Sequence, residues 1–290
     1  MAGAISGPQF LRGRSMRFYV SCDIEGIVGV TSHVQGAPGG HEYEKARAWM
    51  TRSARSVCEA ALSSGATELV LADGHGNGMN LLLDELPENV SVVRSWPREL
   101  LMMEGIQRGS FDGAFLIGYH SSATEANGVL SHTIFGRLIA GVRLNGRECS
   151  ETLISAATAG CFGIPVLMVS GDDQYVANAQ ALLGNVHGVA VKRAVSYQSV
   201  ETVLPEKAYA LLREGAARAI EDRGNVKPFV VPGPFELEIT FRQHLTAEVL
   251  SLLPICERTG ATSVVYRSDD FLDVVRFLVF VTFYSPTPGA

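Results

Sequence analysis

Two acidic residues, Asp23 and Glu25, stand one residue apart at the end of the segment 16–26, which reads MRFYVSCDIEG. The apolar residues before them predict a buried strand, and the glycine after them predicts a loop. Carboxylates at the end of a buried strand usually need a positive group nearby, because burying an unpaired charge is costly. A turn or a helix cap would explain Asp23 without any chemistry, whereas a metal ion would explain both residues.

Three further apolar segments end in a side chain that can bind a metal. The segment ELVLADGH ends in His75, GAFLIGYH ends in His120, and GVLSH ends in His132. Glu151 follows at the start of an apolar segment with helical periodicity. A single histidine at such a position is more often structural, but the carboxyl ends of neighbouring parallel strands converge on one crevice. We therefore expect these side chains to meet there.

The type of metal follows from the side chains, which are imidazoles and carboxylates without a thiolate. That combination favours a catalytic zinc, manganese, cobalt or iron site over a structural cysteine-rich zinc site. About five ligands exceed what one tetrahedral ion with an open position needs. Two ions about 3.5–4 Å apart that share a carboxylate would use all of them. The residues therefore predict a two-metal hydrolase.

The order and spacing of these motifs resemble the zinc D-aminopeptidases of the dipeptide-transport operon type, peptidase family M55. The resemblance extends from Met16 into the C-terminal third and includes the segments 165–173 and 190–193. It implies two zinc ions per subunit and a ring-shaped, decamer-like homo-oligomer. The residues that match the family's zinc ligands are Asp23, Glu25, His75, His120 and Glu151. Asp23 matches the bridging ligand, and His132 matches the catalytic histidine.

The function that this resemblance implies is hydrolysis of the N-terminal amide of short peptides that contain D-amino acids, such as D-alanyl peptides or amides. In the expected mechanism the metal activates a water, and His132 donates to the oxyanion or passes a proton to the leaving amine. A covalent role for His132 remains an alternative. Two other classes stay open: another two-metal amidohydrolase or phosphoesterase, and a metal-binding protein without turnover.

Composition narrows the class of protein and its partners. The 290 residues are 47% hydrophobic and 19% charged, which is enough to bury one large core or two unequal ones. A formal net charge of −6 without a basic cluster argues against a nucleic-acid partner. Five cysteines without a C-x-x-C pair or a secretory signal predict reduced thiols and a cytoplasmic location. No apolar run approaches the ~18–20 residues that cross a bilayer, so we expect no membrane partner.

Strand and helix patterns alternate along the chain, which predicts an α/β fold with a mostly parallel sheet flanked by helices. The expected strands are 17–22, 68–72, 91–94, 113–118 and 165–169, and the expected helices are 42–64, 151–161, 174–183 and 205–223. Three prolines in 226–234 predict a boundary. After it, 235–241 alternates like a half-exposed strand, typical of a smaller α+β portion toward the C-terminus. The apolar run Phe277–Tyr284 reads as a terminal strand or a buried helix.

These patterns predict three parts of the chain. They are a loose tail at 1–15, a metal-binding α/β catalytic domain at 16–225, and a smaller α+β portion packed on it at 226–290. Among the remaining polar residues, His33 lies in the loop after the first motif and is a candidate substrate contact. Asp172 ends another predicted strand, where it would cap the following helix or support a ligand.

Overall fold

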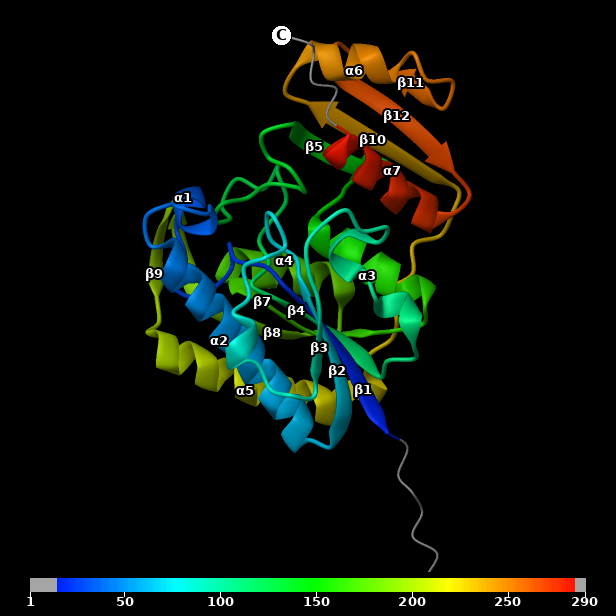
Figure 1. Ribbon diagram of the computed structural model, residues 1–290. Coiled ribbons are helices and arrows are strands. Elements are labelled where there is room, and N and C mark those ends of the chain that lie inside the picture. The colour runs from blue at the N-terminus through cyan, green and yellow to red at the C-terminus, as the bar shows by residue number, and fades with distance from the viewer. Residues whose placement is uncertain (1–14, 285–290) are drawn as a thin grey trace, which may run out of the picture.

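The computed structural model describes residues 15–284 and arranges them around two sheets (Figure 1). The larger sheet has seven strands in the order β3-β2-β1-β4-β7-β8-β9. Their bounds are β1 Met16–Cys22, β2 Ala66–Asp73, β3 Val90–Val93, β4 Gly113–Ile117, β7 Val166–Asp172, β8 His187–Ser196 and β9 Ser199–Thr202. All neighbours pair in parallel except β8 and β9, which form an antiparallel hairpin. Apart from Ser15, the predicted tail lies outside the described residues.

Helices cover both faces of the larger sheet, because its strands carry apolar side chains on both sides. In β1, Phe18 and Val20 pack toward α2 (Tyr43–Ser63) and α5 (Pro205–Glu221). Tyr19 points the other way and joins the core formed with α3 (Glu151–Cys161) and α4 (Asp173–Leu183). The short helix α1 (His33–Gly36) follows the loop after β1. The sheet is therefore buried between two helical layers, and its carboxyl edge is left for the loops.

The smaller sheet has five antiparallel strands in the order β11-β12-β10-β5-β6 and lies at the top of Figure 1. Its elements are β5 Ile139–Leu144, β6 Arg147–Glu148, β10 Phe235–Phe241, α6 His244–Leu250, β11 Cys256–Arg258, β12 Ser263–Ser268 and α7 Phe271–Phe283. Because β5 and β6 precede α3, this sheet takes strands from both sides of position 226. Helix α3 contributes Leu153 and Ile154 to its core. The division of the chain at 225/226 stays a prediction.

This architecture confirms the predicted fold class, a mostly parallel sheet with flanking helices and a smaller α+β portion. The nine strands and helices predicted between 17 and 223 and the strand predicted at 235–241 are all present, with ends within a few residues of those expected. The proline-rich segment 226–234 contains no helix or strand, and 271–283 forms the buried-helix alternative. The short 3-10 helices are Leu83–Glu85, Leu101–Met103, Ile106–Arg108 and Asp222–Asn225. In the described part of the chain, no helix combines the length and apolar character needed to cross a membrane.

Candidate metal centre

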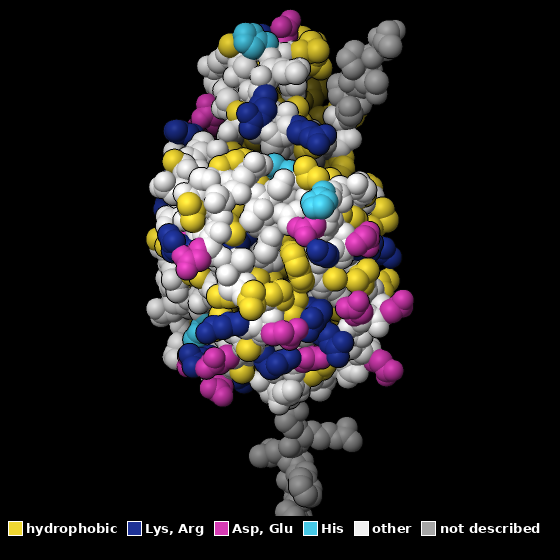
Figure 2. Space-filling model, turned by 90° about the vertical axis from the view of Figure 1, so that its left-hand side faces the viewer, with side chains coloured by type: hydrophobic (Ala, Val, Ile, Leu, Met, Phe, Trp, Pro, Cys, Tyr) yellow, Lys and Arg dark blue, Asp and Glu magenta, His cyan; other side chains and the backbone are white. Residues whose placement is uncertain are grey.

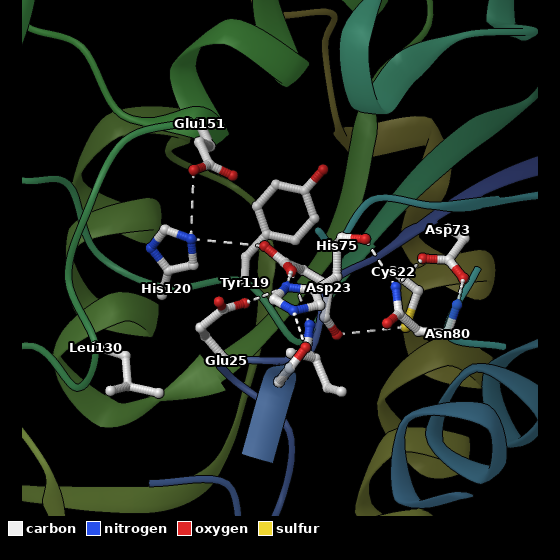
Figure 3. A network of polar contacts seen from close by, with 12 residues as sticks. Cys22, Asp23, Glu25, Asp73, His75, Asn80, Tyr119, His120, Leu130 and Glu151 are labelled. Carbon is white, nitrogen blue, oxygen red and sulfur yellow. Dashed lines mark hydrogen bonds and ion pairs between the residues drawn. The ribbon is translucent and has the colours of Figure 1, made fainter. Parts of the chain in front are cut away.

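The candidate site lies where three adjacent strands end. In the larger sheet β1 pairs with β2 on one side and β4 on the other, so Cys22 is level with both Asp73 and Ile117. The loops that follow these three strands leave the sheet side by side. They carry the six predicted side chains, except that Glu151 opens α3. The structure brings together all six, which are Asp23, Glu25, His75, His120, His132 and Glu151 (Figure 3 labels all but His132).

Asp23 stands between two groups of potential ligands. Its Oδ1 lies 3.1 Å from Nδ1 of His75, and its Oδ2 lies 3.5 Å from Nε2 of His120. On the His75 side, Oε2 of Glu25 lies 2.9 Å from the same Nδ1. On the His120 side, Oε1 of Glu151 lies 3.4 Å from Nε2. One carboxylate therefore presents one oxygen to each group, as a shared ligand of two ions would.

The hydrogen bonds of His75 determine which of its nitrogens faces the carboxylates. Nε2 lies 2.9 Å from the carbonyl oxygen of Gly36, which can only accept, so Nε2 donates. In a neutral ring Nδ1 then carries a lone pair, and that lone pair faces the oxygens of Asp23 and Glu25. Three acceptors meet only if a proton or a metal ion lies among them. A side chain at position 36 would crowd the ring, because a Cβ there would lie 2.8 Å from Nε2.

His120 repeats this arrangement in the second group. Its Nδ1 donates to the backbone carbonyl of Ser121 at 2.9 Å, so its Nε2 faces Asp23 and Glu151. That Nε2 and Oε2 of Glu25 are both buried without a hydrogen-bond partner. Buried polar atoms are rarely left without a partner, and a metal-binding histidine usually donates its other N–H to a carbonyl or carboxylate. The residues present therefore fit two bound cations.

The carboxylates of the site favour a positive charge on the neighbouring histidines even in the absence of a metal. Burial raises the pKa of Asp23 to about 7, and the neighbouring charge of Glu25 adds to the shift. Burial alone would lower the pKa of His120, but the carboxylates of Glu151 and Asp23 outweigh it and raise this pKa to about 10. The pKa of His75 is likewise raised by Glu25 and Asp23 against the effect of burial. The site holds a positive charge, whether protons or metal ions supply it.

His132 lies at the edge of the second group. Its Nδ1 donates to the carbonyl of Leu130 at 2.8 Å, which leaves Nε2 facing Oε1 of Glu151 at 4.0 Å. Its side chain is 17% exposed, compared with 1% for His120 and 4% for Glu151. The ligand atoms of His120, His132 and Glu151 all lie within 4.8 Å of one another. This geometry allows His132 either to bind a metal or to face a substrate.

The backbone around His132 is strained in a way that serves the site. Leu130 and Ile134 have φ angles of 51° and 60°, a region that residues with a Cβ seldom adopt and that is worst for a β-branched side chain. Such positions cost on the order of 1–3 kcal/mol each and cluster at functional sites. Here the carbonyl of Leu130 orients His132, and the amide of Ile134 donates to Oε1 of Glu151 at 2.7 Å. The strained turn thus positions two of the six side chains.

The rim of the site includes two further side chains. The ring of His33 lies with its centroid 5.8 Å from that of His132, and its Nε2 is 2.9 Å from the hydroxyl of Tyr197. Tyr197 lies in the turn between β8 and β9, and its carbonyl accepts from the amide of Leu130 at 3.0 Å. His33 was a candidate substrate contact in the sequence, whereas no pattern pointed to Tyr197.

Buried polar residues behind the site hold its loops. Asp73, the last residue of β2, accepts from the backbone amides of Asn80 and Leu81 at 2.6 and 2.8 Å and so closes the loop that carries His75. Asp172 accepts from the amides of Gln174 and Tyr175, which is the predicted helix cap. No separate role was predicted for Asp73, because a buried residue that holds a loop has no sequence signature of its own.

The model of peptidase family M55, described as D-aminopeptidase, matches residues 16–280. The chain belongs to peptidase family M55. This membership confirms the resemblance inferred from the motifs, and with it the predicted enzyme class, D-aminopeptidase.

A sequence comparison and a structural comparison support the assignment of this M55 chain along nearly its whole length. A curated D-aminopeptidase of Bacillus subtilis (strain 168) is 34% identical over 271 residues, which are 92% of this chain and 97% of the relative. A solved structure, described as the Zn-dependent D-aminopeptidase DppA from Bacillus subtilis, a self-compartmentalizing protease, matches with a TM-score of 0.87 at 32% identity. It covers 92% of this chain and 97% of its own chain.

Proposed function

We propose that this M55 chain hydrolyses the N-terminal amide of short peptides containing D-amino acids, such as D-alanyl peptides, with two zinc ions per subunit. The observation that carries the proposal is the position of Asp23, with one oxygen toward His75 and the other toward His120. The description of the solved relative as a Zn-dependent D-aminopeptidase supports zinc and the substrate class.

The six side chains divide into two ligand groups and one substrate-facing residue. Glu25 and His75 would hold one ion, His120 and Glu151 the other, and Asp23 would bridge them. Zinc bound there would polarise the scissile carbonyl and lower the pKa of a water to about 7. Glu25 and Glu151 are almost fully buried, so these two ligands are themselves shielded from bulk water.

His132 would handle the proton of the reaction. Its Nδ1 hydrogen is engaged by the carbonyl of Leu130, so Nε2 is the atom that exchanges a proton. Burial and the charge of His120 lower the pKa of His132, so its ring is neutral near pH 7 and can accept a proton at Nε2. Delivery of that proton to the amine would release the N-terminal residue.

A short peptide would reach the site past His33 and Tyr197. Both are exposed, and His75 and His132 are the most accessible of the six site residues. Figure 2 shows the side of the molecule that is on the left in Figure 1, where α1 and the β8–β9 hairpin lie. A histidine side chain appears there in the waist between the smaller and larger portions, below basic side chains of the smaller portion. Arg137 acts electrostatically on His33 and Arg242 on Tyr197, and their positive charge would suit the free carboxylate of a short peptide.

We also propose a homo-oligomer. The solved relative is described as self-compartmentalizing, and exposed apolar side chains on the smaller portion would find cover in an assembly. These side chains include Leu245, Val249, Leu252 and Ile255. A cytoplasmic location, consistent with five free cysteines, stays a prediction.

One experiment separates the proposed function from its alternatives. The purified chain is assayed with D-alanyl and L-alanyl dipeptides, their amides and phosphate esters, before and after chelation, and its zinc content is measured. We expect release of the N-terminal D-residue, loss of activity on chelation and recovery with zinc. Cleavage of phosphate esters but no peptide would favour a phosphoesterase. Zinc binding without any product would make the chain a metal-binding protein.

A further inference from the structure

A buried lysine lies directly behind the loop that carries Asp23 and Glu25. Lys192, in the middle of β8, is only 3% exposed. Its ammonium group donates to the backbone carbonyls of Glu25, Ile27 and Val30, with Nζ–O distances of 2.5, 3.0 and 2.6 Å. An ammonium group has three hydrogens, so its donors are all used within one loop. Lys192 takes no part in the mechanism proposed above.

The loop depends on this contact, because among the described residues only the carbonyl of Ile27 has a second backbone donor, the amide of Val30 at 3.2 Å. Ile24, Ile27 and Val30 are fully buried and belong to the hydrophobic core under α2 and α5. A buried carbonyl without a donor is costly, and here three carbonyls from a six-residue stretch point at one atom. The loop thus folds around a positive charge that the protein itself provides.

The charge of Lys192 is balanced by acidic groups that also serve the site. Asp172 is its register partner on β7. Burial lowers the pKa of Lys192 to about 7, and the charges of Asp172 and then Glu25 act in the opposite direction and favour the ammonium form. Oδ2 of Asp172 accepts from the amide of Val129 at 3.4 Å, in the loop that leads to His132. Lys192 and Asp172 therefore connect the sheet to two of the three loops that build the metal site, those after β1 and β4.

We propose that Lys192 is a positioning residue that holds the backbone from Glu25 to Val30 in the conformation needed for metal binding. The inference rests on the proposed function for the identity of the ligands Asp23 and Glu25. It requires that loss of the ammonium group weakens zinc binding more than it weakens the fold. It also requires that, once the ammonium group is lost, the loop from Glu25 to Val30 becomes mobile more readily than the other loops at this edge of the sheet.

The test compares Lys192→Met, Lys192→Gln and the control Tyr19→Phe. Tyr19 is also buried and donates to two backbone carbonyls, of Met102 and Glu104, at 3.1 and 2.8 Å, but that segment carries no ligand. Zinc affinity of each metal-free chain is measured by competition with a chromophoric chelator. Amide hydrogen exchange is followed over 24–30, and thermal unfolding is recorded in parallel.

For Lys192→Met we expect zinc affinity to fall about 10–100-fold, the range known for residues that orient metal ligands, with faster exchange at the amides of Gly26 and Val30. Lys192→Gln keeps an N–H donor and should recover part of that affinity. Tyr19→Phe should lower the melting temperature while zinc affinity stays within about twofold.

Two results would overturn the inference. One is a Lys192→Met chain that binds zinc as the wild type does, or loses no more affinity than Tyr19→Phe. The other is failure of both Lys192 variants to fold, which would make the residue a general structural element. Because zinc titration needs no substrate, a wild-type chain that binds zinc but cleaves no peptide would contradict the proposed function alone.

Discussion

The imidazole rings of His120 and His132 are stacked, with their centroids 4.0 Å apart and their planes inclined by 11°. Each ring donates its Nδ1 hydrogen to a backbone carbonyl, so both Nε2 atoms face Glu151, at 3.4 and 4.0 Å. The two histidines therefore differ mainly in how far their side chains are exposed to solvent. His120 is buried between two carboxylates, whereas His132 is nearer the solvent and touches His33. That difference supports a ligand role for the first and a substrate role for the second.

Replacement of His132 tests this division. We expect His132→Ala to keep both zinc ions while kcat falls about 10²–10⁴-fold, because a positioned acid–base or oxyanion group is lost. KM should change much less, since the interaction forms mainly in the transition state. His33→Ala is the matched control on the rim and should affect KM more than kcat. Loss of a zinc ion from His132→Ala would make it a ligand, and an unchanged kcat with full zinc would make it a bystander.

Replacement of Asp23 tests the bridge. The wild-type chain should hold close to two zinc equivalents, and Asp23→Ala should lose both, because each ion loses the same carboxylate. Glu25→Gln, which touches only the His75 group, should lose one ion and retain the other. Elemental analysis of the three dialysed proteins decides the matter. A single ion per chain that survives Asp23→Ala would rule out the dinuclear arrangement.

A comparison of two histidines separates ligand from structural roles. His75→Ala should reduce zinc affinity and abolish nearly all activity. The metal-free variant should still melt within a few degrees of the metal-free wild type. His187, whose Nε2 pairs with Asp222 at 3.0 Å on the surface, serves as control. His187→Ala should leave zinc affinity and activity intact, because a surface ion pair contributes roughly 0–1 kcal/mol. The reverse pattern in melting curves and zinc titrations would make His75 structural.

The sequence predicted the convergence of the site because Asp23, His75 and His120 each follow an apolar strand, and parallel strands share one carboxyl edge. It could not predict how their nitrogens are oriented, because the partners are the carbonyls of Gly36 and Ser121, which carry no side-chain signal. The left-handed turn around His132 is equally invisible in the sequence.

The hairpin of β8 and β9 was missed for a different reason. It lies at the edge of the sheet, and polar and exposed residues interrupt its apolar alternation. Lys192 and Tyr197 both come from this hairpin, so their contacts with the site could not be predicted either. Strands β5 and β6 escaped notice because one contains a glycine and the other has only two residues. Position at an edge does not by itself explain the outcome, because β3 lies at the opposite edge of the larger sheet and was predicted.

Removal of the metal should reverse the dependence of stability on pH. In the metal-free chain the folded pKa of His120 is raised from 6.5 to about 10, so its contribution to stability is fully present below pH 6.5 and is lost as pH rises through 10. The pKa of Asp23, raised from 3.8 to about 7, acts in the same direction, and its contribution is lost as pH rises through 7. The metal-free chain should therefore melt at a lower temperature at pH 9.5 than at pH 6.5, by on the order of several degrees.

Zinc should produce the opposite trend, because it must displace the protons that His75 and His120 hold. The melting temperature of the chain in excess zinc should rise as pH increases from 5 to 7.5, and zinc uptake near pH 7 should release protons that a weakly buffered indicator can detect. His120→Gln provides the control, since a side chain that does not titrate should flatten the metal-free profile above pH 7. A metal-free melting temperature that rises from pH 6.5 to 9.5 would show that the carboxylates do not hold protons on these imidazoles, and the electrostatic basis of the proposed metal site would be lost.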